Sequence, residues 1–231
     1  MDNLYKKSIE IILNNQEKNG AYVASPKFDT YKYCWIRDGS FIAYSMDVSN
    51  NFESSEKFYL WIDSVIKRYS SKVSNIVQKL DNGQKIEACD FMNARYTLEG
   101  YSEKEEGWGN FQLDAYGTWL WGLTQHIKLS GRKDLLEKFK DSIYTTIKYI
   151  ENLWFYPNYD IWEENKDKIH TSTLACLYGG LHSINEFLKD KSVEKTASRI
   201  KSFILTNCIK DYTFIKYIGT PDIDSSLIWL A

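Results

Sequence analysis

Apolar residues recur at the spacing of an α-helix along most of the chain. Residues 2–15, 38–48 and 58–69 each carry such a stripe on one face, which predicts three amphipathic helices. The pattern fails over residues 72–110, where the turn signal at 81–84 indicates a long excursion with short strands. The chain therefore begins with helices and then leaves them for about forty residues.

The helical pattern returns at residue 111 in two segments joined by a short turn. Apolar positions from 113 to 127 form one stripe, and Gly131 is placed to cap its end. A second stripe over residues 135–154 stops before Pro157, because a proline ring cannot continue a helix. The two segments predict a helical hairpin.

A second hairpin is predicted near the end of the chain. Its first helix follows Thr171 or Ser172, whose hydroxyls suit an N-cap, and its second runs from Val193 to Ile204. With a final stub over residues 222–231, about seven helical segments are expected and little strand. The predicted class is all-α, in a single domain over residues 1–231, and hairpin after hairpin suits a toroid or solenoid.

Composition and charge exclude several classes of function. The 29 Lys and Arg residues nearly balance 31 Asp and Glu, so no positive surplus exists for nucleic-acid binding. No apolar run reaches the roughly 18 residues of a membrane span, and no secretory signal is recognised at the N-terminus. Aromatic residues make up 16% of the chain, which indicates either a ring-rich core or a groove for sugars.

Cysteine and histidine give no sign of a metal or redox site. The cysteines are far apart without a CxxC pair, and the histidines have no ligand spacing. We therefore expect no metal and no cofactor, structural or surface histidines, and a reducing cytoplasm as the location. The residues concerned are Cys34, Cys89, Cys176, Cys208, His126, His170 and His182. The charge runs at 103–106 and 189–191 are expected to be solvated.

Three segments concentrate aromatic residues, carboxylates and arginine where a loop leads into a helix. They are YKYCWIRD at 31–38, GWGNFQLD at 107–114 and YDIWEE at 159–164. If successive helix pairs form a ring, such loops lie on one rim and converge on one pocket. Loops held by a rigid scaffold often carry function.

Glycoside hydrolysis would use this set of residues, because it needs one carboxylic acid to protonate the leaving oxygen and a second carboxylate. In Trp162-Glu163-Glu164 an indole can desolvate a neighbouring carboxyl, and adjacent carboxylates disfavour joint ionisation. Both effects favour one protonated carboxyl, as a general acid requires. Arg37 and Asp38 offer a donor and an acceptor for neighbouring sugar hydroxyls.

Each signal has an ordinary structural alternative. A Trp-Glu-Glu tripeptide is usually an acid pair at a helix edge, and an Arg-Asp pair is usually a structural ion pair. Trp35 and Trp108 are of a type that more often lies in a core than under a sugar. Trp119 and Trp121 fall inside a helical stripe, so we expect them in the core.

Together and in order, the motifs resemble those of glycoside hydrolase family 15, the glucoamylase and glucodextranase family that includes some trehalases. The resemblance covers most of the chain and rests on GAYVASP at 20–26 followed by Tyr31, Tyr33, Trp35, Arg37 and Asp38, on WGN at 108–110 with QLDAYG at 112–117, on DIWEE at 160–164, and on YIG at 217–219 with DIDSSL at 222–227.

This resemblance implies an (α/α)6 barrel of twelve alternating inner and outer helices, and inverting exo-hydrolysis of α-glucosidic bonds in an α-glucan or α-glucoside. It implies that Glu163 is the general acid. The implied substrate-binding residues are Tyr31, Trp35, Arg37, Asp38, Trp108, Trp162 and Glu164.

The chain departs from the family pattern near its end. Seven segments and a stub are too few for twelve helices, and the family's catalytic base is expected beyond Ala231. We expect a partial barrel, inactive alone: a fragment, a split gene product or a degenerate member. Exposed apolar residues would favour poor solubility, a second chain or a homodimer. They are Ile223, Leu227, Ile228 and Leu230.

Two alternatives remain open. The first is a catalytically inactive glucan-binding or regulatory remnant of the same fold, which the missing base favours. The second is an unrelated helical toroid, such as a zinc-dependent one, which the scattered cysteines and histidines disfavour.

Overall fold

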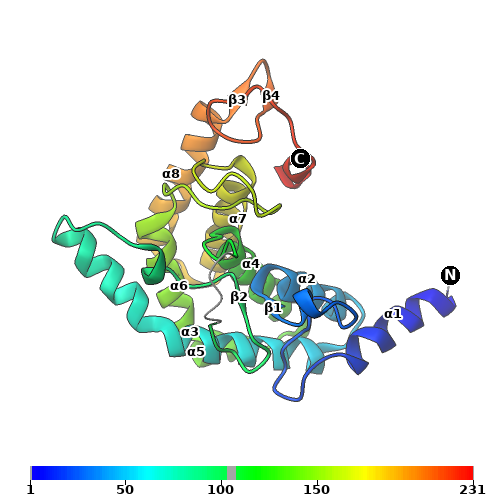
Figure 1. Ribbon diagram of the computed structural model, residues 1–231. Coiled ribbons are helices and arrows are strands. Elements are labelled where there is room, and N and C mark those ends of the chain that lie inside the picture. The colour runs from blue at the N-terminus through cyan, green and yellow to red at the C-terminus, as the bar shows by residue number, and fades with distance from the viewer. Residues whose placement is uncertain (1, 103–107, 231) are drawn as a thin grey trace.

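The computed structural model describes residues 2–102 and 108–230, and the charge run at 103–106 lies outside them. The regular structure of the described chain is almost all helical (Figure 1), which confirms the predicted all-α class. Its helices are α1 (Asp2–Asn14), α2 (Ile36–Val48), α3 (Phe52–Asp81), α4 (Asp114–Ser130), α5 (Leu135–Lys138), α6 (Lys140–Leu153), α7 (Thr171–Leu188) and α8 (Lys191–Asn207).

Short strands and 3-10 turns connect the helices. Strand β1 (Cys34–Trp35) pairs antiparallel with β2 (Arg95–Tyr96), with Trp35 opposite Arg95. Strand β3 (Ile209–Lys210) pairs antiparallel with β4 (Thr213–Phe214). The 3-10 turns are η1 (Asp29–Tyr31), η2 (Ala88–Asp90) and η3 (Ser225–Leu230). The β1–β2 ladder joins the predicted excursion to the start of α2, and so to the first motif.

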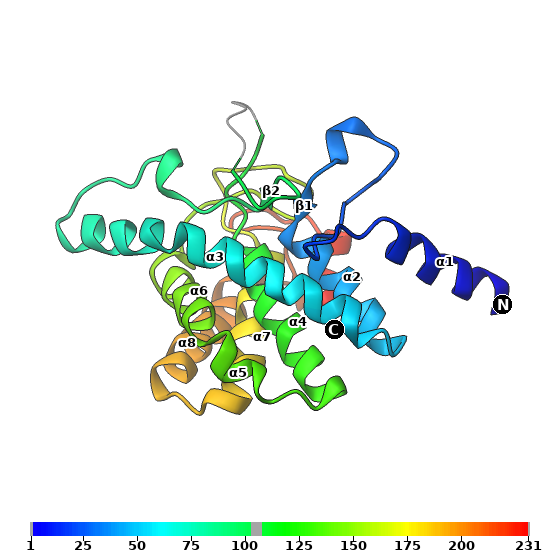
Figure 2. The ribbon, with the colours of Figure 1, turned by 90° about the horizontal axis from the view of Figure 1, so that it is seen from below.

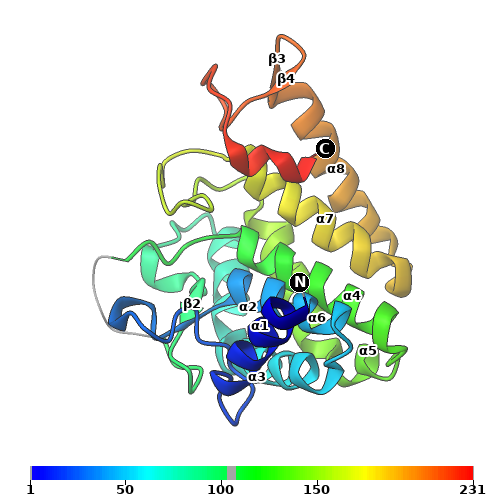
Figure 3. The same ribbon diagram turned by 90° about the vertical axis from the view of Figure 1, so that its right-hand side faces the viewer.

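The helices form two layers. The inner helix α4 packs between α2 and α7, and the long α3 runs across α2, α4 and α6 (Figure 2). Helix α8 packs on α7 from the outside, as the view from another side also shows (Figure 3). Inner and outer helices therefore alternate along the chain, as in part of an (α/α)6 toroid.

The core is built from the apolar faces that these layers share. Trp119 of α4 is fully buried, as predicted, among Tyr59, Phe58, Tyr116 and other large side chains. Trp121 differs from the prediction, because it is only half-buried. It turns toward the open side of α4, where its ring lies 5.0 Å from that of Tyr44.

Several helix limits differ from the predicted ones, and the stripe over residues 135–154 is divided at Phe139 into α5 and α6. Helix α3 continues to Asp81 because Val73 and Ile76 extend its buried stripe past residue 72. The turn signal at 81–84 marks its end, with Gly83 at φ +63°. The N-cap of α7 is His170 rather than Thr171 or Ser172.

The last segment is partly covered. Leu227 lies in η3, which packs against α7, and its side chain is buried. The expectation that it is exposed was therefore wrong. Ile223 and Ile228 are exposed as expected, and Leu230 is half-buried. Among the described helices, none is long and apolar enough to cross a membrane.

Candidate active site

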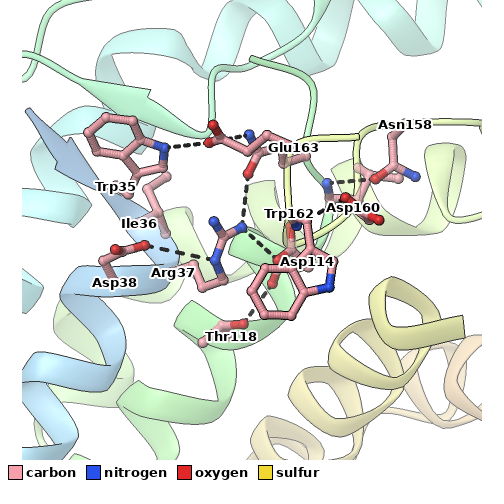
Figure 4. Close-up of polar contacts among 12 residues, drawn as sticks. Trp35, Ile36, Arg37, Asp38, Asp114, Thr118, Asn158, Asp160, Trp162 and Glu163 are labelled. Carbon is pink, nitrogen blue, oxygen red and sulfur yellow. Dashed lines mark hydrogen bonds and ion pairs between the residues drawn. The ribbon is translucent and has the colours of Figure 1, made fainter. Parts of the chain in front are cut away.

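The three motif segments meet in space although they are far apart in sequence (Figure 4). The first leads into α2, the second into α4, and the third forms the loop before α7. Side chains from all three are joined through Gln112, which binds both Arg37 and Glu163. The predicted convergence of these loops on one region is therefore present in the structure.

Arg37 lies at the bottom of this region. Its Nη1 donates to Gln112 Oε1 and to Asp114 Oδ2, each at 2.8 Å, and its Nε lies 3.8 Å from Asp38 Oδ2. Burial by itself would lower the pKa of Arg37, but the carboxylates of Asp114, Asp38 and Glu163 outweigh it and raise that pKa. Arg37 is therefore a permanent cation in a largely buried position.

Glu163 is oriented by two donors. Its Oε1 accepts hydrogen bonds from Trp35 Nε1 at 2.9 Å and from Gln112 Nε2 at 3.0 Å. Its backbone is in the left-handed region at φ +64°, which is uncommon for a residue with a side chain. A residue held in this conformation by its surroundings is a frequent feature of active sites.

Asp160 closes the turn that holds Glu163 in this conformation. Its buried Oδ1 accepts from the backbone N–H of Trp162 at 3.0 Å and of Glu164 at 2.9 Å. The backbone N–H of Glu163 donates to the Asp160 carbonyl at 2.9 Å. One buried carboxylate therefore organises the DIWEE motif.

Trp162 and Glu164 do not surround Glu163 as the sequence suggested. The half-exposed Trp162 donates from Nε1 to Asp224 Oδ1 at 2.8 Å, and Glu164 Oε2 lies 3.3 Å from Lys216 Nζ. The indole that contacts the Glu163 carboxyl belongs to Trp35 instead. Adjacent residues in a turn point to different partners, which tripeptide sequence alone does not reveal.

Aromatic rings form a wall beside Glu163. Trp35 is buried, and its ring centroid lies 5.9 Å from that of the half-buried Trp108 and 5.8 Å from that of the exposed Tyr31. The guanidinium of Arg95 lies 4.3 Å from the Trp108 ring and 4.5 Å from that of Tyr33. This buried cation, which the sequence analysis missed, packs against the wall through cation–π contacts.

Asp38 lies at the edge of the site with its side chain partly exposed. Partial burial raises the pKa of its carboxyl, the charges of Asp114 and Glu163 add to this, and Arg37 opposes it. Arg37 and Asp38 thus present a cation and an acceptor side by side, as the sequence predicted.

Two of the three histidines, His126 and His182, are separate from this arrangement, and His170 reaches it only through Asp160. His126 Nδ1 lies 2.7 Å from Asp47 Oδ1, with both side chains fully buried, so this pair joins α4 to α2. His170 is also buried and its Nδ1 lies 3.8 Å from Asp160 Oδ2, whereas His182 is exposed. No group of three His, Cys, Asp or Glu residues is arranged to hold a metal within the part of the chain that the structure describes.

Comparison with known proteins gives consistent matches. The family model for glycosyl hydrolases family 15 matches residues 1–231. Isomaltose glucohydrolase of Kribbella flavida is 31% identical over 97% of this chain and 59% of its own length. Trehalase 1 of Sulfolobus acidocaldarius is 21% identical over 87% of this chain and 36% of its own length.

Solved structures agree with this result. A glycosidase in complex with glucose has a TM-score of 0.90 and 30% identity, over 97% of this chain and 62% of that one. A glucoamylase from Saccharomycopsis fibuligera has a TM-score of 0.70 at 16% identity, over 94% of this chain and 52% of that one. These matches confirm the six-hairpin toroid as the fold, of which this chain forms a part.

Proposed function

Because the chain belongs to glycosyl hydrolases family 15, we propose that it forms the glucose-binding and proton-donating part of an α-glucosidase. The observation that carries this proposal is the carboxyl of Glu163, held by Trp35 and Gln112 beside the buried cation Arg37. With Oε1 held by two donors, Oε2 is the oxygen we assign to proton transfer onto the glycosidic oxygen.

The surrounding residues would bind the terminal glucose. Arg37 and Asp38 provide a donor and an acceptor for hydroxyl groups, and Tyr31 and Trp108 provide aromatic faces for the sugar ring. Trp35 would act through Glu163, since it is buried. Trp162 and Glu164 would complete the subsite from the loop before α7.

Inverting hydrolysis also needs a carboxylate base about 6.5–9.5 Å from the acid. Four carboxylates near Glu163 already have other partners or roles: Asp114 is engaged by Arg37, Asp160 by backbone N–H groups and Glu164 by Lys216, and Asp38 beside Arg37 is assigned above to the sugar hydroxyls. We therefore place the base outside residues 1–231, and we expect the chain alone not to turn over substrate. This expectation also keeps open the alternative of a glucan-binding remnant without catalysis.

The substrate we favour is isomaltose or a related α-glucoside. The Kribbella flavida isomaltose glucohydrolase is 31% identical to this chain, against 21% and 22% for the two trehalases from Sulfolobus acidocaldarius. The chain spans 59% of the length of the former, so its acceptor-side contacts would include residues from elsewhere.

We also propose that a second chain, or a second copy of this one, covers the open side of the inner helices. A groove of about 200 Å³ lies there between α2, α4 and α7. Its lining residues include Phe41, Trp121, Ala175 and Gly179. Apolar surface of this kind is usually covered in a protein.

The four cysteines are free thiols, which fits the reducing cytoplasm as our proposed location.

The test combines calorimetric binding of acarbose with glucose release from isomaltose, maltotriose and trehalose. Glu163→Gln is compared with the wild type, and Glu186→Gln, an exposed residue paired with Lys128, is the matched control. Release that only Glu163→Gln abolishes supports the enzyme and means that an unforeseen residue or a second chain supplies the base. Binding without release is the result expected of this chain alone, under both the proposal and the inactive remnant. Neither binding nor release by the folded chain would contradict the proposal.

A further inference from the structure

We propose that Lys216 is the positioning residue of the general-acid loop, which it holds through three carboxylates. Its Nζ lies 3.6 Å from Asp160 Oδ2, 3.3 Å from Glu164 Oε2 and 3.5 Å from Asp224 Oδ2. This inference rests on the proposed role of Glu163, and it assigns a function to a residue that lies outside all three motif segments.

The backbone of Lys216 is itself fixed. Its carbonyl accepts from the N–H of Thr171 at 3.1 Å, at the first residue of α7, and its N–H donates to the Asp222 carbonyl at 2.8 Å. The side chain is largely buried, with 16% exposed. The ammonium is therefore carried by a backbone that is held to the start of α7 and to the segment before η3.

Asp160 needs this cation more than the other two carboxylates do. Its side chain is 2% exposed, and its Oδ1 already accepts from the turn that carries Glu163. Its Oδ2 accepts no hydrogen bond from the described residues and faces only Lys216 Nζ and, at 3.8 Å, His170 Nδ1. A buried carboxylate left without a counter-charge is strongly destabilised, so the turn depends on Lys216.

Asp224 links Lys216 to the half-exposed Trp162. It accepts from Trp162 Nε1 at 2.8 Å while facing Lys216, so the indole is tied to the same cation. Hydrogen bonds from Ser226 and Trp162, together with the charge of Lys216, outweigh burial and lower the pKa of Asp224 to about 2. Both residues next to Glu163 are thus anchored at one ammonium, Trp162 through Asp224 and Glu164 directly.

The carboxylates that face Lys216 come from two parts of the chain, and one histidine faces Asp160 behind them. Asp160 and Glu164 lie in the loop before α7, Asp224 lies just before η3, and His170 at the start of α7 faces Asp160. Replacing Lys216 with methionine would leave three neighbouring carboxylates without their shared cation. Their mutual repulsion would favour protonation of one of them and would loosen the turn.

The first measurement follows the indole N–H resonance of Trp162 against pH, assigned by its loss in Trp162→Phe. In the wild type the hydrogen bond to Asp224 should persist down to about pH 3. In Lys216→Met the transition should move upward from about 2 by the part of the lowering that the charge of Lys216 supplies, since the hydrogen bonds from Ser226 and Trp162 remain. Lys168→Met is the matched control. Lys168 lies in the loop before α7 that also carries Glu163, but it pairs with Asp167 and is 39% exposed.

The second measurement is the affinity for acarbose at neutral pH. Lys216→Met should weaken it by about tenfold or more, Lys216→Arg should restore most of it, and Lys168→Met should leave it within about twofold. Unchanged indole titration and unchanged affinity in Lys216→Met would overturn the inference. If Lys216→Met does not fold, Asp224→Asn decides in its place, since it should also weaken binding, and wild-type affinity in that variant would overturn the inference.

The two proposals fail in different ways. A wild-type chain that binds no acarbose contradicts the proposed function, while the shifted indole titration in Lys216→Met still supports the positioning of the loop. A wild-type chain that binds acarbose, with Lys216→Met binding it equally well, supports the proposed function and overturns the role of Lys216.

Discussion

The indole nitrogen of Trp35 donates a hydrogen bond of 2.9 Å to Glu163 Oε1, across a separation of 128 residues. Trp35 belongs to the β1–β2 ladder, whose position is set by the start of α2, whereas Glu163 lies in an irregular loop. This bond therefore ties the proposed acid to the rigid part of the fold. A catalytic group held in this way needs less reorganisation when substrate binds.

Trp35→Phe should lower the affinity for acarbose by about three- to tenfold, since it removes one of two donors to Glu163 and keeps a ring in the same place. Calorimetric titration measures the effect. Trp119→Phe is the control, because it trims an equally large buried indole within α4 at a position that makes no bond to Glu163. That control should lower stability without changing affinity, and equal loss of affinity in both variants would contradict the assignment.

Arg37→Leu should reduce the free energy of unfolding by about 3–5 kcal/mol, because it leaves the carboxylate of Asp114 buried without its partner. The side chains of Arg37 and Asp114 are 10% and 2% exposed. Arg132→Leu breaks ion pairs with Glu56 and Asp134 in which Arg132 is 43% exposed, so the expected loss is much smaller than that of Arg37→Leu. Urea unfolding of both variants separates the two cases, and similar losses would refute this ranking.

Much of the fold followed from helical periodicity, because an amphipathic stripe reports directly on which face is buried. The stripe over residues 113–127 became α4, and Gly131 caps it in the left-handed conformation at φ +75°. Helix limits were less predictable. The end of α3 depends on Val73 and Ile76, whose stripe is diluted by polar residues on the exposed side.

The candidate site was predictable as a set of loops but not as a set of contacts. Arg37, Asp38 and Glu163 are marked by local sequence, since each lies in a cluster of aromatic and charged residues. Lys216 and Arg95 have no such local signal, because each acquires its role from partners that only the tertiary structure brings near. Local sequence placed Trp162 beside the Glu163 carboxyl, whereas in the structure Trp35 contacts it and Trp162 binds Asp224. This contact too is set by the tertiary structure.

Gly180→Ala should destabilise the protein by about 1–3 kcal/mol or more, because α4 and α7 touch at this point. A Cβ at Gly180 would lie 2.8 Å from the Cα of Gly117, which belongs to the facing backbone and has no side chain to move aside. The neighbouring Gly179→Ala is the control, since its Cβ would meet no described atom within 4 Å. That change should stabilise α7 by up to about 1 kcal/mol through helix propensity, and a loss as large as that of Gly180→Ala would disprove the close approach.

Asp224 should make the free energy of unfolding depend on pH in the acidic range. Its folded pKa of about 2 lies below the ordinary value of 3.8, so the folded state binds fewer protons than the unfolded state between these values. The stabilisation by ionised Asp224 is therefore present above about pH 4 and is lost as the pH falls through 3.8 toward 2. The wild type should accordingly exceed Asp224→Asn in unfolding free energy near neutral pH and converge with it at low pH. Urea titrations from pH 2 to 7 measure this difference in unfolding free energy. Asp211→Asn, in the exposed turn between β3 and β4, is the control and should follow the wild type. A constant gap between the wild type and Asp224→Asn over that range would show that the carboxylate charge contributes nothing to stability.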